Sequence, residues 1–197
     1  MNFDNITIDK TIAIYSKLGY TLLDGTQQLN VFGVRSTNPV VNTFCDAVCL
    51  LYKDYGGSWN LAKYTATTDP GIYWLQNPEN VRGTSILIPG RYPESHKVGL
   101  HKGEYRALVQ NSPLKVWRDN AKDGTLVHDP VNIDVGIFGI NIHHAGVDST
   151  QVYNWSAGCQ VLAKLSEFND LMGLVDENIK NGHGEVFSYV LLTEDLY

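Results

Sequence analysis

Apolar residues recur at three- and four-residue steps in two parts of the chain, and this spacing predicts two helices. The first covers the stretch from Thr7 to Leu18, with Thr7 or Asp9 as its cap and Gly19 just beyond its end. The second follows residue 164, and Ser166 is its expected N-cap. The apolar stripe of this second helix consists of Leu165, Phe168, Met172, Val175 and Ile179.

From about Leu29 onward, short runs rich in β-branched and aromatic residues alternate with turn residues. The expected strands are LNVFGVR, TFCDAVCLLY, WNLAKYTATT, TSILIPG, GEYRALVQ, LKVWRD, VNIDVGIFGINIH and EVFSYVLL. Strands at this spacing, without alternating helices, are typical of a β-sandwich or a barrel-like core. We therefore expect a mainly β (α+β) fold, with residues 1–28 as an N-terminal helical element and residues 29–197 as the principal domain.

The composition is that of a folded protein and excludes several classes of partner. The chain has 197 residues, of which 43% are hydrophobic and 18% are charged, and its formal net charge is −6. Because no basic cluster occurs, neither nucleic acid nor an anionic membrane surface is an expected partner. No run approaches the roughly 20 apolar residues of a membrane-spanning helix, so we expect no membrane insertion. The segment MNFDNITIDK lacks the features of a secretory signal, which predicts synthesis in the cytoplasm.

The chain contains three cysteines, an odd number that argues against a disulfide framework. Cys45 and Cys49 lie in one expected strand, about 13 Å apart at roughly 3.3 Å per residue, whereas a disulfide spans at most about 7 Å. We interpret both as small apolar residues of that strand. Cys159 differs because the segment SAGC places a glycine directly before its thiol.

An apolar strand, GIFGINIHH, ends in His143 and His144, and Cys159 follows in the chain after a polar loop. A nucleophilic cysteine needs a base within hydrogen-bond reach and donors for the oxyanion that forms on the substrate. The end of a rigid strand can fix an imidazole, and the glycine of SAGC permits a sharp turn beside the thiol. Side chains alternate along a strand, so only one of the two histidines can meet the thiol. These residues predict a cysteine nucleophile with a histidine base.

The segments INIH and SAGC resemble the signature of the L,D-transpeptidase (YkuD-type) catalytic domain, which reads Ile-His, a loop of variable length, and then Ser-His-Gly-Cys. The resemblance is confined to residues 140–159. It implies an L,D-transpeptidase-like β-sandwich with a helix after the catalytic cysteine. It also implies an attack on peptide bonds of peptidoglycan stem peptides, with no cofactor and no metal.

The resemblance also assigns roles to individual residues. It implies that Cys159 is the nucleophile and that His143 is its base. His144 would contribute a carbonyl that orients the imidazole. The backbone amides of Gly158 and Cys159 would bind the oxyanion, and Ser156 would help to shape this site.

Two departures from the family signature alter the surroundings of this pair. Ala157 replaces the histidine that precedes the glycine, so one polar group near the oxyanion is missing. Gln160 and Val161 stand where the family usually has an apolar residue and then an arginine or asparagine that is thought to hold the substrate carboxylate. Hydrolysis becomes the simpler outcome, since water can replace an amine acceptor at the thioester.

Four further residues are the expected substrate contacts. His101 lies in the segment GLHKGEY beside a turn glycine, where it can line the cleft. Tyr153 and Trp155 precede SAGC and can form a platform for a sugar or a peptide. Gln160 follows the nucleophile directly. A surface or packing role remains open for His101, Tyr153 and Trp155.

We therefore expect a cysteine-dependent peptidoglycan peptidase of the phage endolysin or virion-associated type, which cleaves stem peptides or cross-links. A chain made in the cytoplasm without a signal would reach the cell wall through a holin or by virion delivery. A true L,D-transpeptidase that forms cross-links is an alternative. Another is a zinc peptidase with His101, His143 and either Cys159 or Asp148 as ligands. A non-catalytic cell-wall-binding or phage structural module is the third, and the sequence does not indicate the oligomeric state.

Overall fold

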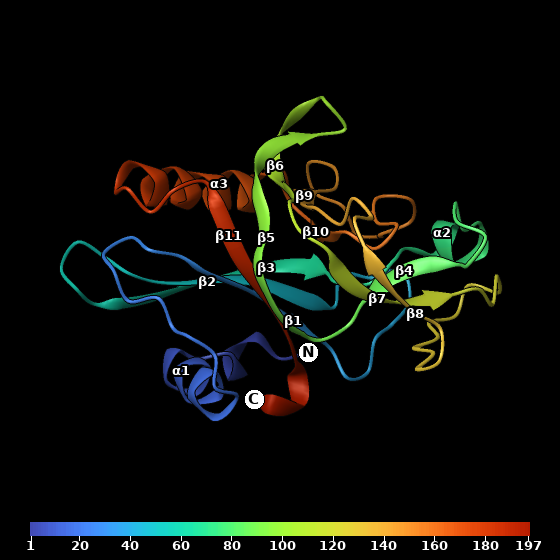
Figure 1. The fold of residues 1–197 in the computed structure, drawn as a ribbon, viewed down its shortest axis with the longest axis horizontal. Coiled ribbons are helices and arrows are strands. Elements are labelled where there is room, and N and C mark those ends of the chain that lie inside the picture. Colours follow the sequence, from blue (N-terminus) through green and yellow to red (C-terminus); the bar gives the residue numbers. More distant parts are fainter.

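The computed structural model describes residues 1–197, and its strands form one closed barrel and one small separate sheet (Figure 1). The barrel strands, in spatial order, are β1 (Asn30–Arg35), β11 (Val186–Thr193), β5 (Gly90–His101), β6 (Tyr105–Gln110), β9 (Ile142–His144), β10 (Gln160–Leu162), β3 (Trp59–Thr67) and β2 (Asp46–Lys53). The small sheet has the order β4 (Thr84–Leu87), β7 (Leu114–Asp119) and β8 (Ile133–Gly136). The expected mainly β fold is confirmed. The expected two-layer sandwich is not found, because the main sheet closes on itself through hydrogen bonds.

Two strand pairs of the barrel are parallel, and both join segments that are distant in the sequence. The final strand, β11, runs parallel to β1, with Val31 opposite Tyr189, and antiparallel to β5. Strands β9 and β10 are also parallel, with His143 opposite Val161. The second pair therefore aligns the end of the histidine segment with the segment that follows the thiol.

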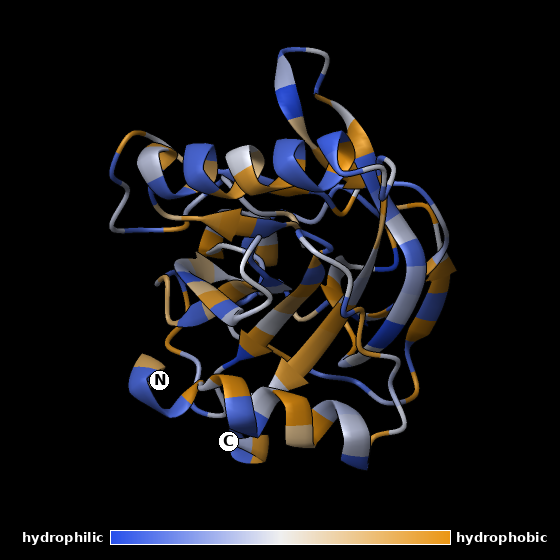
Figure 2. Cartoon of the chain, turned by 90° about the vertical axis from the view of Figure 1, so that its left-hand side faces the viewer, coloured by the Kyte–Doolittle hydropathy of each residue, from blue (hydrophilic) through white to orange (hydrophobic).

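Two helices, α1 (Ile8–Lys17) and α3 (Leu165–Lys180), lie on opposite sides of the barrel (Figures 1 and 2). The apolar stripe of α3 packs with the interior core, whose buried members include Leu50, Tyr64, Leu108, Ile142, Phe168 and Val175. Residues of α1 cover the outer face of β1, β2 and β11 through a second cluster that includes Ile14, Tyr15, Phe32, Cys49 and Val190. Both faces of these three strands are therefore buried. No helix combines the length and apolar character needed to cross a membrane.

The helix ends agree with the sequence at one position and differ at another. Thr7 caps α1, since its side chain accepts a hydrogen bond from the backbone N–H of Lys10. The expected N-cap Ser166 is wrong, because Lys164 occupies that position without a side-chain cap. The Lys164 carbonyl accepts the first helical hydrogen bond, from Phe168 N–H at 3.1 Å, which places Ser166 inside the first turn.

The structure differs from the expected elements in three places. The expected strand over residues 131–143 is divided into β8 and β9, which belong to different sheets. Gly139 lies between them with φ +73°, a left-handed conformation that interrupts a ladder and favours glycine. The twelve-residue strand β5 and the short helix α2 (Ile72–Gln76) were not expected. Glu94 has φ +49° inside β5, at the place where the pairing with β11 shifts its register.

Candidate active site

The parallel pair β9–β10 places the thiol and the first histidine on one side of the barrel wall. Gln160 pairs with Ile142 and Val161 with His143, so Cys159 lies beside Asn141 at the start of the pair. The backbone N–H of Asn141 donates to Sγ of Cys159 at 3.4 Å. Paired residues project from the same face, so the Cys159 and His143 side chains share one face, whereas Ile142 packs into the interior core.

A tight turn before β10 presents the thiol. The Ser156 hydroxyl donates to the Cys159 carbonyl at 2.8 Å and accepts from the Gly158 N–H at 3.2 Å, which closes the turn on itself. Gly158 has φ +125°, and a Cβ atom at this position would lie 2.5 Å from the carbonyl oxygen of Ser85. Only glycine fits here, because both the backbone conformation and the space exclude a side chain. Ser156 thus holds the shape of the turn that carries Cys159.

The thiol of Cys159 is half-buried among polar backbone groups rather than packed in hydrocarbon. Its Sγ donates to the Gly139 carbonyl at 3.3 Å. Burial raises the pKa of Cys159 to about 11, against the opposing effects of the Asn141 N–H and the Lys102 charge. No hydrogen bond joins Sγ to a histidine ring, so the resting thiol is neutral and is not paired with its expected base.

His143 has the protonation pattern of a base. Its Nδ1 lies 2.8 Å from the His144 carbonyl oxygen, the contact that the family resemblance implies. Because a carbonyl oxygen only accepts, Nδ1 carries the proton and Nε2 carries the lone pair. That Nε2 atom is buried and has no hydrogen-bond partner. Burial, followed by the neighbouring His101, lowers the pKa of His143 to about 3, so the ring is neutral.

The ring of His144 lies on the other face of β9. It packs 4.5 Å from the Tyr105 ring and 5.0 Å from the Phe168 ring of α3, measured between centroids. Its Nδ1 bonds to the carbonyl of Ala145. The two histidines therefore separate as strand alternation requires, and only the His143 side chain shares the face of the thiol.

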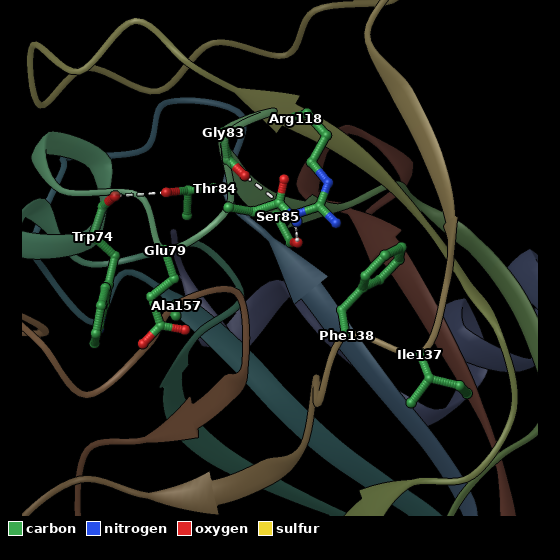
Figure 3. A pocket seen from close by; sticks show the side chains of 10 residues that line it. Trp74, Glu79, Gly83, Thr84, Ser85, Arg118, Ile137, Phe138 and Ala157 are labelled. Atoms are coloured by element: carbon green, nitrogen blue, oxygen red, sulfur yellow. Dashed lines mark hydrogen bonds between the residues drawn. The ribbon is translucent and has the colours of Figure 1, made fainter.

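A cavity of about 370 Å³ opens between the small sheet and the turn of residues 156–159 (Figure 3). Two of its lining residues, Phe138 and Ala157, directly precede Gly139 and Gly158 in the chain. The other lining residues are Trp74, Glu79, Asn80, Gly83, Thr84, Ser85, Arg118 and Ile137.

The cavity carries charges of both signs on different walls (Figure 3). The guanidinium of Arg118 is largely occupied, since it contacts the Asp134 carboxylate at 3.1 Å and donates to Ser85 Oγ at 2.8 Å and to the Gly83 carbonyl at 3.1 Å. Glu79 is exposed and forms no ion pair.

The expected substrate contacts divide into three groups. His101 lies within the site, with its ring stacked on the His143 ring at 3.9 Å and 20°. Tyr153 and Trp155 are exposed but do not line the cavity, and Tyr153 packs 5.7 Å from the Tyr73 ring. The expected contact of Gln160 with substrate is wrong, because this side chain is fully buried in the barrel wall.

Gln160 instead supports the turn of residues 156–159 from inside the barrel. Its amide nitrogen donates to the Gly158 carbonyl at 3.2 Å, and its amide oxygen accepts from the Tyr189 hydroxyl at 2.9 Å. Gln160 therefore fixes the peptide group of Gly158, directly before Cys159.

Two site residues were missed by the sequence analysis. Asn141 contacts the thiol through its backbone, and strand alternation with His143 two residues later could have shown that it shares this face. Arg118 could not have been found, because nothing in the segment LKVWRD indicates which of its charged residues is buried at the cavity.

No group of three or more His, Cys, Asp or Glu side chains is arranged to hold a metal ion, so the ligand set of the zinc alternative is not assembled. All three cysteines are free thiols. Comparisons with protein-family models, with curated proteins and with solved structures find no match to this chain.

Proposed function

We propose that this chain is a cysteine-dependent peptidoglycan peptidase with an L,D-transpeptidase-like fold, of the phage endolysin or virion-associated type. Its substrates would be stem peptides or cross-links of the bacterial cell wall. The observation that carries the proposal is the placement of Cys159 and His143 on one face of two adjacent parallel strands. His143 Nε2, whose lone pair has no hydrogen-bond partner in the chain, would supply the base for the thiol.

In the proposed reaction, the Cys159 side chain rotates from the Gly139 carbonyl toward His143. Sγ then attacks the carbonyl carbon of the substrate, Nε2 takes the thiol proton, and the C=O π electrons move to oxygen. Collapse of this intermediate breaks the C–N bond, and the imidazolium returns the proton to the leaving amine. A water molecule then attacks the thioester carbon while the same Nε2 takes its proton. The C–S bond breaks, the imidazolium returns the proton to sulfur, and the carboxylic acid product leaves and ionises in solvent.

The two pKa shifts determine when the proton moves. Because burial raises the pKa of Cys159 to about 11 and lowers that of His143 to about 3, a resting thiolate–imidazolium pair is disfavoured. Proton transfer therefore accompanies the attack of sulfur on the carbonyl carbon. In this respect the site resembles a serine nucleophile with its histidine more than a preformed cysteine ion pair.

The test is to incubate purified sacculi with the protein and to analyse the soluble fragments by mass spectrometry. Shortened stem peptides are expected from the wild type, while the Cys159→Ala variant releases none. Cys45→Ala removes a free thiol elsewhere in the chain and serves as the matched control that keeps the activity.

Other outcomes of this experiment would identify the alternatives. Cross-linked dimers formed from a disaccharide peptide would indicate a true L,D-transpeptidase. Inhibition by a chelator together with indifference to iodoacetamide would indicate a zinc peptidase. Equal results for the wild type and Cys159→Ala would reject catalysis and favour a wall-binding or structural module.

A further inference from the structure

The turn of residues 156–159 provides fewer donors for an oxyanion than the family resemblance implies. The N–H of Gly158 is already engaged, since it donates to Ser156 Oγ at 3.2 Å. The N–H of Cys159 donates to no group of the chain. Ala157, in the place of a histidine, carries no side-chain donor. An additional donor beside the thiol would therefore strengthen the stabilisation of a tetrahedral intermediate.

Asn141 fixes the protonation of a second imidazole at this site. Its Oδ1 accepts from the backbone N–H of Gln110 at 2.9 Å, and a backbone N–H only donates, so the orientation of the amide is determined. The Nδ2 group of Asn141 must then donate to Nδ1 of His101 at 3.0 Å. Because Nδ1 accepts, the neutral ring of His101 carries its proton on Nε2. Burial lowers the pKa of His101, which keeps the ring neutral.

The same contacts place His101 next to the reacting atoms. Asn141 donates to Sγ of Cys159 through its backbone and to His101 through its side chain, so one residue contacts both. The His101 ring stacks on the ring of the base, His143, at 3.9 Å. Nε2 of His101 has no hydrogen-bond partner in the chain and is accessible to solvent. Its N–H is therefore open to a ligand.

We propose that the Nε2–H of His101, held in this tautomer by Asn141, donates a hydrogen bond to the oxyanion formed when Cys159 attacks a carbonyl group. This inference rests on the proposed function of Cys159. In the step concerned, an S–C bond forms, the thiol proton passes to His143 Nε2, and the negative charge on oxygen is shared between the His101 and Cys159 N–H groups. His101 thus supplies from the end of β5 the side-chain donor that Ala157 cannot supply.

The experiment compares two reactions of the same thiol. Acylation by p-nitrophenyl acetate passes through an oxyanion, whereas alkylation by iodoacetamide displaces iodide and forms none. Both rates are measured at Cys159 in the full chain, with mass spectrometry to separate it from Cys45 and Cys49. Two variants are matched: His101→Phe keeps a flat ring for stacking but has no donor, and His101→Gln retains an amide N–H near the position of Nε2.

The expected result is a selective loss of acylation. His101→Phe should lower the acylation rate by about 100-fold, the usual effect of removing one oxyanion donor, and leave alkylation within about twofold. His101→Gln should recover most of the loss. Equal changes in both rates would assign His101 a merely structural role, and an unchanged acylation rate would show that backbone amides suffice.

Two further measurements separate this inference from the proposed function. If the Cys159→Ala variant releases p-nitrophenolate from the ester as fast as the wild type, the nucleophile assignment fails and the role of His101 fails with it. If acylation depends on Cys159 but not on His101, only the present inference fails. Nitrogen-15 chemical shifts of the His101 ring test the tautomer without any substrate, and a proton on Nδ1 would overturn the proposal.

Discussion

Replacement of Gly158 by alanine should damage the fold and the candidate site together. The backbone angle φ of +125° is one that alanine rarely adopts, and such strain costs about 1–3 kcal/mol. The added Cβ would also lie 2.5 Å from the Ser85 carbonyl oxygen, so one backbone segment must move. Ser85 cannot yield easily, because Ile86 and Leu87 after it are fully buried. We expect a total loss of roughly 3 kcal/mol or more in the free energy of unfolding.

The matched control for this experiment is Gly57→Ala. Gly57 also has a positive φ, +82°, but a Cβ there meets no atom within 4 Å. It should lose about 1 kcal/mol, the cost of the left-handed backbone alone. Urea unfolding measures both losses, and alkylation of Cys159 reports whether the turn has moved. If Gly158→Ala unfolds at the same urea concentration as Gly57→Ala and its thiol reacts as in the wild type, the assigned role of the turn is refuted.

Three further predictions concern the thiol, the buried imidazoles and the support beneath the turn. Because burial raises the pKa of Cys159 to about 11, its alkylation rate should rise about tenfold per pH unit up to about pH 10; a plateau below about pH 8 would indicate a preformed thiolate. Burial lowers the pKa of His96 to about 4 and that of His143 to about 3. Below about pH 6.5 these rings take up protons in the unfolded state but not in the folded state, so the free energy of unfolding falls as the pH falls. Each ring should then cost about 2 kcal/mol by about pH 5, and the urea midpoint of His96→Gln should depend less on pH than that of the wild type. Gln160→Leu leaves the Tyr189 hydroxyl without its partner and should cost about 1–3 kcal/mol, part of which Tyr189→Phe recovers in a double-mutant cycle.

The sequence analysis succeeded where local patterns are decisive. The helix spacing over residues 165–179 and the Thr7 cap are local, and both are present in the structure. Alternation along a strand separated His143 from His144 correctly, because the two rings lie on different faces of β9.

The remaining features depend on contacts between distant segments. A repeating strand pattern is compatible with a sandwich and with a barrel, and only the pairing of β11 with both β1 and β5 decides between them. Gln160 follows Cys159 in the sequence, yet its side chain is buried in the barrel, where its amide oxygen accepts from the Tyr189 hydroxyl. The cavity combines residues from α2, β4, β7 and the turn of residues 156–159, and no single sequence motif contains all four segments.

The position of β11 constrains how the chain reaches its native state. This strand comes last in the sequence but lies between β1 and β5, so the barrel stays open along its length until nearly the whole chain is present. During synthesis from the N-terminus, the unpaired edges of β1 and β5 are exposed while the ribosome still holds the C-terminal residues. Early termination before residue 186 would therefore yield an aggregation-prone fragment rather than a smaller folded protein.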